Sequence, residues 1–215
     1  MPLPTFAPVT AKAQPSETMN RTQASSQLGL NGPSVDKMIK AGMLVAPIRS
    51  SKVRDLTKYE RLRVTDGELT VLRADARAES DPVLYPDERR RWIGFHVEHT
   101  DEELEASSLR WWRCNPERVL DNELLVVTVA TFPVALYLLE DKMGPLIRPG
   151  ENQPRYGFTG RLLARVSPGM EITHNRLAPG HLQKSAKQIM RSRIAVSSGG
   201  PIGYLEAETV GQPVS

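Results

Sequence analysis

Apolar residues near the N-terminus recur with the period of a helix. Val35, Met38 and Ile39 stand three or four positions apart, which is the spacing of a buried helical stripe. Pro33 suits the first turn of such a helix, because proline lacks the N–H group that would have no partner there. Gly42 is a natural end, since glycine readily takes the left-handed conformation that follows many helices. The pattern therefore predicts a helix between Pro33 and Gly42.

A shorter helix is expected just before this one. Residues 22–28 place Ala24 and Leu28 on one side, and Gly29 interrupts the pattern. After Pro47, we expect residues 48–53 to form a small hairpin or wing. Two short helices joined at Gly29 and followed by a wing are therefore predicted.

The rest of the chain mixes strand and helix patterns, so the predicted fold class is α+β. Two apolar, β-branched runs on either side of residues 131–133 predict a β-hairpin. Thr100 and Glu103 have the spacing of a capping box, which starts a helix. We expect strands over residues 69–72, 92–97, 124–129, 134–139, 156–166 and 202–205, and helices over residues 101–113 and 178–192.

Composition divides the chain into segments. The first 20 residues are rich in Pro, Ala, Thr and Ser and lack periodic apolar spacing, which predicts a disordered leader. The expected organisation is a leader over residues 1–20, the module of two helices and a wing over 21–63, a connecting segment over 64–90, a small mixed α/β domain with an antiparallel sheet over 91–208, and a tail over 209–215.

Charge is unevenly distributed along the chain, although the net charge is only +3. Residues 21–63 carry nine Lys or Arg against three acids, which is a net of +6. Residues 64–108 carry five against twelve, a net of −7, and residues 109–215 carry thirteen against nine, a net of +4. Attraction to a polyanion is therefore expected to be local to the first module.

Candidate chemistry for catalysis is sparse. A single cysteine, Cys114, excludes a disulfide within the chain and fits a reducing cytosol. The pairs His96 and His99, and His174 and His181, lack a third ligand at a clear spacing, so no metal site and no cofactor are expected. Without a signal peptide or an apolar run of 18 residues, the chain is expected to be cytoplasmic, with no membrane partner. We expect no enzymatic activity.

The segment around Gly29 fits the packing template of a helix-turn-helix. That motif needs a small residue in its first helix, a glycine at the turn, and apolar residues that fix the two helices against each other. Five positions agree in the right order around the glycine: Ser25, Leu28, Leu30, Val35 and Met38. A recognition helix in the major groove reads base edges and contacts phosphates with its basic residues.

This template assigns candidate DNA contacts. On the exposed side of the second helix, which also carries Asp36, we expect Ser34 and Lys37 to contact bases and Lys40 to contact a phosphate. The wing would place Arg49, Lys52 and Arg54 near the adjacent backbone. A possible second DNA contact is the stripe of the last helix, although an ordinary amphipathic surface helix explains it too; its residues are Lys184, Lys187 and Arg191.

Residues 24–56, with the sequence ASSQLGLNGPSVDKMIKAGMLVAPIRSSKVRDL, resemble the small winged helix-turn-helix of the excisionase and MerR-type DNA-binding families. The shared features are the turn at Gly29, the Ser34-Val35 start of the second helix, and the run from Ile39 to Leu44. The likeness covers only these residues. No long coiled-coil helix follows them, unlike in MerR-type dimers.

Together these patterns lead us to expect a sequence-specific protein that binds double-stranded DNA, of bacterial or phage type and nucleoid-associated. It would act as a transcriptional regulator or a DNA-architectural factor. The region after residue 64 would serve self-association as a homodimer, contact with another protein, or a second DNA contact. Two alternatives stay open: an interaction adaptor that does not bind DNA, and a nucleic-acid-processing enzyme with its site in the α+β region.

Overall fold

The computed structural model describes residues 17–82, 90–197 and 199–208, and its fold class is α+β, as predicted. The predicted tail and most of the predicted leader lie outside the described residues. Residues 18 and 19, at the end of the predicted leader, form a short strand, β1 (Thr18–Met19). Among the described helices, none combines the length and the apolar composition needed to cross a lipid bilayer.

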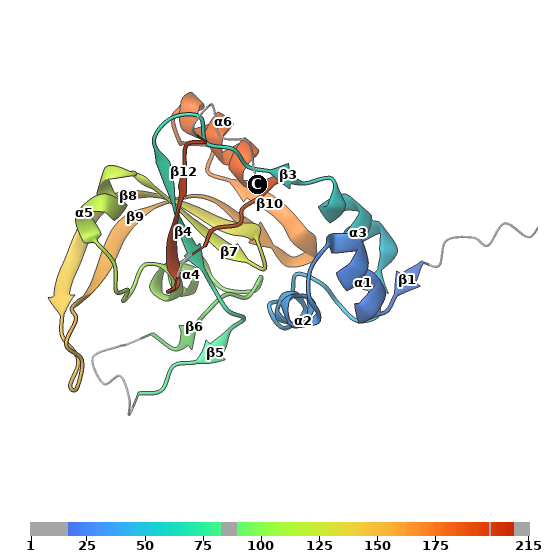
Figure 1. The fold of residues 1–215 in the computed structure, drawn as a ribbon, viewed down its shortest axis with the longest axis horizontal. Helices are drawn as coiled ribbons and strands as arrows, with labels where there is room; N and C mark the ends of the chain where they lie inside the picture. The colour runs from blue at the N-terminus through green and yellow to red at the C-terminus, as the bar shows by residue number, and fades with distance from the viewer. Residues whose placement is uncertain (1–16, 83–89, 198, 209–215) are drawn as a thin grey trace, which may run out of the picture.

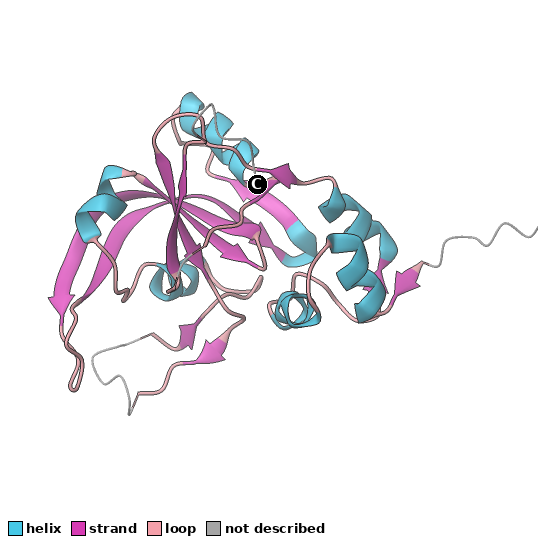
Figure 2. Ribbon diagram, in the orientation of Figure 1, coloured by secondary structure: helices cyan, strands magenta, loops and turns pink. Residues whose placement is uncertain are grey.

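A twisted six-stranded sheet forms the centre of the molecule (Figures 1 and 2). Its strand order is β10-β9-β8-β7-β4-β12. Strands β4 and β7 run parallel, whereas each of the other neighbouring pairs is antiparallel. The sheet is therefore mixed, whereas an antiparallel sheet was expected. The strands are β4 (Glu68–Arg73), β7 (Leu124–Val129), β8 (Phe132–Leu146), β9 (Arg155–Ser167), β10 (Glu171–His174) and β12 (Ile202–Glu206).

Apolar runs that are buried on both faces form the central strands. Residues 125–129 of β7 and 132–137 of β8 are all buried, which explains why these runs are nearly continuously apolar instead of alternating. The predicted hairpin between them is confirmed. Its turn is tight, because Ala130 and Thr131 both have positive φ angles, of 50° and 78°. The prolonged part of β8, residues 140–146, leaves the core and pairs with β9 as a two-stranded arm.

Three helices lie around the sheet: α4 (Asp101–Ser108), α5 (Pro116–Asp121) and α6 (Gly180–Ile189). The capping box of Thr100 and Glu103 is present as predicted. The helix was expected to continue to Arg113 but ends at Ser108, because the backbone of Trp112 exchanges two hydrogen bonds with Tyr156.

The strand predicted over residues 92–97 is shorter than expected. Only β6 (Trp92–Ile93) forms, and it pairs with β5 (Ala78–Glu79). Beyond it Gly94 has a φ angle of 74°, and a Cβ atom there would lie 2.6 Å from the carbonyl oxygen of Ala76. This left-handed glycine turns the chain out of the strand.

Three short helices form the N-terminal part of the chain: α1 (Arg21–Leu28), α2 (Gly32–Lys40) and α3 (Ser50–Thr57). The hairpin predicted over residues 48–53 was wrong. Residues 48 and 49 form β2 (Ile48–Arg49), which pairs with β1 before α1, and the helix α3 begins at Ser50. The pairing partner of β2 therefore lies upstream of the two helices, and no hairpin follows Pro47.

The N-terminal helices dock on the sheet through main-chain and ring contacts. The N–H of Val97 donates to the carbonyl oxygen of Ala41 at 3.0 Å, and the ring of Tyr59 meets that of Phe132 edge to face at 5.9 Å. β3 (Glu60–Arg61) pairs with β11 (Ser192–Arg193) in parallel. Buried residues from both parts form one continuous hydrophobic cluster, so the orientation of the helices on the sheet is fixed by packing.

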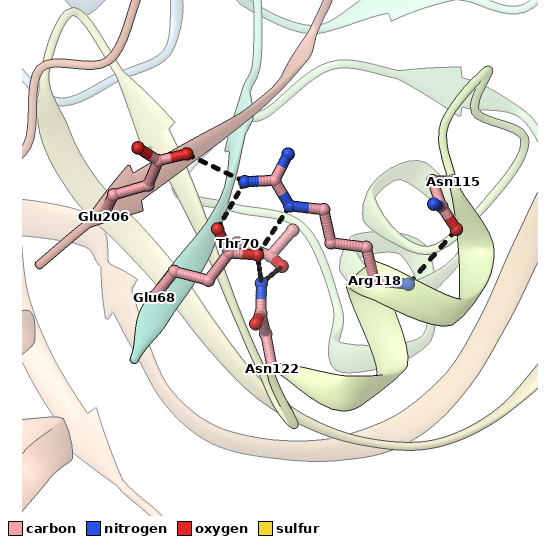
Figure 3. A network of polar contacts seen from close by, with 6 residues as sticks. All are labelled: Glu68, Thr70, Asn115, Arg118, Asn122 and Glu206. Carbon is pink, nitrogen blue, oxygen red and sulfur yellow. Dashed lines mark hydrogen bonds and ion pairs between the residues drawn. The ribbon is translucent and has the colours of Figure 1, made fainter. Parts of the chain in front are cut away.

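A polar network joins α5 to the strands β4 and β12 (Figure 3). Arg118 makes a two-pronged contact with Glu68 at 2.7 and 2.5 Å and also contacts Glu206 at 2.9 Å. Asn122 donates to Glu68 and to Thr70. The hydrogen bond from Arg118 holds the pKa of Glu68 below its usual value. Because the guanidinium of Arg118 already binds these carboxylates, Arg118 has a structural role: it holds α5 against the sheet.

Candidate nucleic-acid interface

The first helix of the candidate interface is set at both ends by its own side chains. Asn20 caps α1 by accepting the N–H of Gln23, whose side chain accepts the N–H of Asn20 in return. At the other end Gly29 adopts a left-handed conformation with a φ angle of 62°. The hydroxyl of Ser25 donates to the carbonyl oxygen of Leu30 at 2.6 Å, so this small residue also fixes the path of the turn.

The second helix begins immediately after this turn. The side chain of Asn31 accepts the N–H of Ser34 at 2.9 Å, and Pro33 lies in the first turn of α2 as predicted. Val35 and Met38 have no solvent exposure and pack into the core beside α1. The predicted packing of two short helices about Gly29 is therefore present. Of the four residues expected on the exposed side of α2, only Lys40 is exposed, whereas Ser34, Asp36 and Lys37 are half-buried.

The structure divides the seven predicted DNA contacts into three groups. Ser34 is half-buried at the start of α2. Three side chains are already engaged: Asp36 pairs with Arg21, the Nζ atom of Lys37 lies 2.5 Å from a carboxylate oxygen of Asp75, and the Nζ atom of Lys52 donates to the carbonyl oxygen of Gly169 at 2.6 Å. The remaining three are exposed and make no ion pair with any described residue: Lys40, Arg49 and Arg54.

Several cations on and near the sheet already have carboxylate partners. Arg161 pairs with Glu140 at 2.7 Å, and Lys142 pairs with Glu117. Glu151 accepts from Arg155 and also pairs with Arg113; the hydrogen bond from Arg155 is the main reason that the pKa of Glu151 falls to about 2. These cations carry their own counter-charges. The exposed cations without one are concentrated on the N-terminal helices and on the C-terminal third of the chain.

The last helix places its three candidate residues on the surface. Lys184, Lys187 and Arg191 are all exposed, and none of them makes an ion pair with a described residue. Figure 1 shows α6 at the upper edge of the molecule and α2 in its lower half, so the two predicted DNA contacts are separate surfaces.

An open cleft of about 540 Å³ lies beside α2, which contributes Lys37 to its lining. It lies at the carboxyl ends of the parallel strands β4 and β7, a position where many open sheets bind ligands. Its charged and hydroxyl-bearing lining is Lys37, Arg73, Asp75, Thr128 and Thr131. Sequence reasoning missed Asp75, because its position beside α2 results from packing between distant segments.

A second polar hollow lies between α4 and the β9–β10 edge. Arg165 is nearly buried and donates to Asp101 at 2.7 Å and to the carbonyl oxygen of His99 at 2.6 Å. Burial lowers the pKa of His99 to about 4, more than the nearby carboxylate of Glu103 raises it. The guanidinium of Arg165 is thus bound by protein groups, and its bonds to Asp101 and His99 hold the start of α4 against the sheet.

The structure offers little for nucleophilic or metal chemistry within the described residues. No three His, Cys, Asp or Glu side chains lie close enough together there to hold a metal ion. Burial raises the pKa of the Cys114 thiol to about 11, so it is protonated at neutral pH and is a poor nucleophile.

Comparison with protein-family models, curated proteins and solved structures finds no match to this chain. The geometry of α1 and α2 and the distribution of unpaired cations are therefore the observations from which a function has to be inferred.

Proposed function

We propose that this protein binds double-stranded DNA in a sequence-specific way, with α2 in the major groove, and acts as a transcriptional regulator or a DNA-architectural factor. The observation that supports this most directly is the packing of α2 on α1 through the buried Val35 and Met38, with Lys40 exposed at the end of the helix. A helix held rigidly by its inner face can present its outer face to base edges.

Unpaired cations around α2 supply the attraction to the phosphate backbone. Lys40 ends α2, Arg49 precedes α3, and Arg54 is exposed on α3. A cation without a local carboxylate partner can contact a phosphate without first breaking an ion pair. Each such contact releases counterions from the DNA, so the affinity depends steeply on salt.

Lys37 can contact DNA only after it leaves its ion pair with Asp75. Its contact with Asp75 is an ion pair at the surface, since 83% of the Asp75 side chain is exposed. Pairs of this kind contribute at most about 1 kcal/mol. A phosphate or an acceptor on a base edge can therefore replace Asp75 at small cost.

The test begins with selection of random duplexes on the full-length protein, followed by fluorescence anisotropy with the selected duplex over a range of salt concentrations. The variant Lys40→Ala/Arg54→Ala is expected to bind much more weakly, and its slope of log affinity against log salt should be smaller by about 2. The matched control Lys142→Ala/Arg161→Ala removes the same charge from cations that already have partners, and it should bind like the parent.

Three results would overturn the proposal. The first is equal binding by the two double variants. The second is a lack of preference for any duplex over heparin, which favours an adaptor that docks acidic proteins. The third is cleavage of labelled duplex in the presence of magnesium or manganese, which favours a nuclease. Circular dichroism spectra that match the parent protein establish that each variant is folded.

A further inference from the structure

The C-terminal third of the chain contains a long stretch without acidic residues. Between Glu171 and Glu206 there are five Lys or Arg and no Asp or Glu. Residues 37–54 also carry five Lys or Arg and no acid, but two of these cations, Lys37 and Lys52, already have partners, and α2 and α3 contain Asp36 and Asp55. The stretch between Glu171 and Glu206 includes α6, a helix with no acid along its own sequence.

The helix α6 is amphipathic, with apolar side chains buried and basic side chains exposed. Its buried residues, Ala186 and Ile189, pack on the sheet side, while Lys184 and Lys187 are exposed. Arg191 follows just after the helix and is also exposed. Arg176, before the helix, is exposed as well, and none of these four cations makes an ion pair with a described residue. They form one basic surface, here called the α6 surface: Arg176, Lys184, Lys187 and Arg191.

The positive charge of this surface acts on its neighbours. The pKa of His174 in β10 is lowered first by burial and then by the charges of Lys187 and Arg191. Its Nδ1 atom is buried and has no hydrogen-bond partner among the described residues. A neutral imidazole beside two cations leaves their charge uncompensated.

The α6 surface and α2 belong to separate parts of the fold. Figure 1 shows α6 at the upper edge of the molecule and α2 in its lower half. The N-terminal helices are fixed on the sheet by a continuous core, so this separation does not depend on a flexible linker. This separation is the reason to assign the α6 surface to a DNA segment other than the one at α2.

Resting on the proposed DNA binding by α2, we propose that the α6 surface holds the phosphate backbone of a second duplex, so that one protein molecule bridges two DNA segments. Binding at this surface is expected to be independent of sequence, because cations that contact phosphates carry no base information. The α2 helix selects the first segment, and the α6 surface captures whichever segment comes near.

A nucleic acid fits this surface better than a membrane does. A helix that lies in a bilayer interface needs an apolar face free to enter the lipid. The apolar residues of α6 are occupied by the sheet, since Ala186 and Ile189 are buried, as is Met190, which follows them. Leu177, just before the helix, is 93% exposed, but a single apolar side chain is not the apolar face that an interfacial helix inserts, so the charge of this surface favours a polyanion in water.

The test is a capture experiment with two duplexes. The selected duplex is immobilised on beads, full-length protein is bound to it, and a fluorescent duplex of unrelated sequence is added. The variant Lys184→Ala/Lys187→Ala/Arg191→Ala is expected to bind the immobilised duplex like the parent and to capture at least about tenfold less of the second. The salt slope of capture should be smaller by about 2.7, since each of the three phosphate contacts contributes about 0.9. The matched control Arg113→Ala/Lys142→Ala/Arg161→Ala should capture like the parent.

Two outcomes would overturn bridging by the α6 surface. If the triple variant of α6 captures the second duplex as well as the parent, bridging comes from another source, such as two associated copies that each use α2. If the parent captures no second duplex and the triple variant weakens binding to the first, both surfaces contact one duplex.

Failure of the proposed function gives a different result. In that case Lys40→Ala/Arg54→Ala leaves binding to the selected duplex unchanged, whereas the triple variant of α6 removes it. The two hypotheses are therefore separated by the same set of variants.

Discussion

Arg193 donates a hydrogen bond of 2.8 Å to the carbonyl oxygen of Leu28, the last residue of α1. This carbonyl is one of those that a helix leaves without an intrahelical partner at its C-terminal end, where a cation also interacts well with the helix dipole. The guanidinium lies over the ring of Phe132 as well, 5.3 Å from its centroid. A residue close to the C-terminus of the chain thus completes the first helix of the candidate interface and fixes it to the sheet.

Replacing Arg193 with Met is expected to loosen this connection. The change leaves the Leu28 carbonyl without its charged donor, which should cost about 1–3 kcal/mol in the free energy of unfolding. Urea unfolding followed by tryptophan fluorescence measures the loss, and limited proteolysis should show faster cleavage around residues 28–31. Arg191→Met, in an exposed side chain two positions earlier, is the control and should leave both measurements unchanged.

The need for a left-handed conformation at Gly29 can be tested by comparison with Gly32. Both glycines have room for a Cβ atom, but Gly32 has an ordinary backbone conformation. A Cβ atom at Gly29 or at Gly32 would meet nothing within 4 Å, but only Gly29 has a positive φ angle, of 62°. Gly29→Ala should therefore lower the free energy of unfolding by about 1 kcal/mol through backbone strain alone. Gly32→Ala, at the start of α2, should keep it or raise it by up to about 0.5 kcal/mol. Equal effects in denaturant titrations would mean that the left-handed turn is not needed.

Local patterns were sufficient to predict α1, α2, α4, α6 and most of the strands of the sheet, but not α3 or α5. The burial of Val35 and Met38 follows from helical spacing, and the hairpin of β7 and β8 follows from two apolar runs, because both depend on neighbours in the sequence. The exposed position of Lys40 could also be predicted in this way, whereas Arg54 was assigned to a wing and lies on the helix α3. Each of these elements is determined by nearby residues, within one or two helical turns or within one pair of adjacent strands.

Features that depend on distant partners could not be predicted. The hairpin expected over residues 48–53 failed because β2 pairs with β1, from a segment whose composition resembles a leader. Lys52 was assigned to DNA, but its ammonium group meets the carbonyl oxygen of Gly169, 117 residues away. Lys37 likewise meets Asp75. Charge counts along the sequence cannot show which cations already have partners, and this distinction is what defines the candidate surfaces.

The pair of Lys37 and Asp75 restrains the proposed recognition helix, so removing the carboxylate should favour DNA. Asp75→Asn keeps the shape of the side chain and frees Lys37 from an ion pair worth up to about 1 kcal/mol, which corresponds to about a two- to fivefold gain in affinity for the selected duplex. Anisotropy titrations at constant salt measure the gain. Asp66→Asn removes an exposed carboxylate elsewhere and controls for net charge. If both variants gain equally, Asp75 acts only through long-range repulsion and not by holding Lys37.

His99 connects the stability of the fold to pH. Only 3% of the residue is exposed, and neither ring nitrogen has a hydrogen-bond partner among the described residues. Its ring meets that of Phe95 edge to face at 6.3 Å. Burial lowers the pKa of His99 to about 4, whereas the unfolded chain has the ordinary value of 6.5. Between these pH values the unfolded state binds a proton that the folded state does not, so stability is complete above pH 6.5 and declines as the pH falls toward 4.

The unfolding free energy should therefore be lower at pH 5.0 than at pH 7.5, and His99 alone should account for about 2 kcal/mol of the difference. His99→Gln replaces the imidazole with a side chain that does not titrate, and its stability should depend less on pH. Part of the dependence should remain, because burial also lowers the pKa values of His96 and His174. Urea titrations at the two pH values give the comparison, with the exposed His181→Gln as the control that keeps the parent difference. An unchanged difference in the His99 variant would show that this imidazole is protonated as easily in the folded protein as in the unfolded chain.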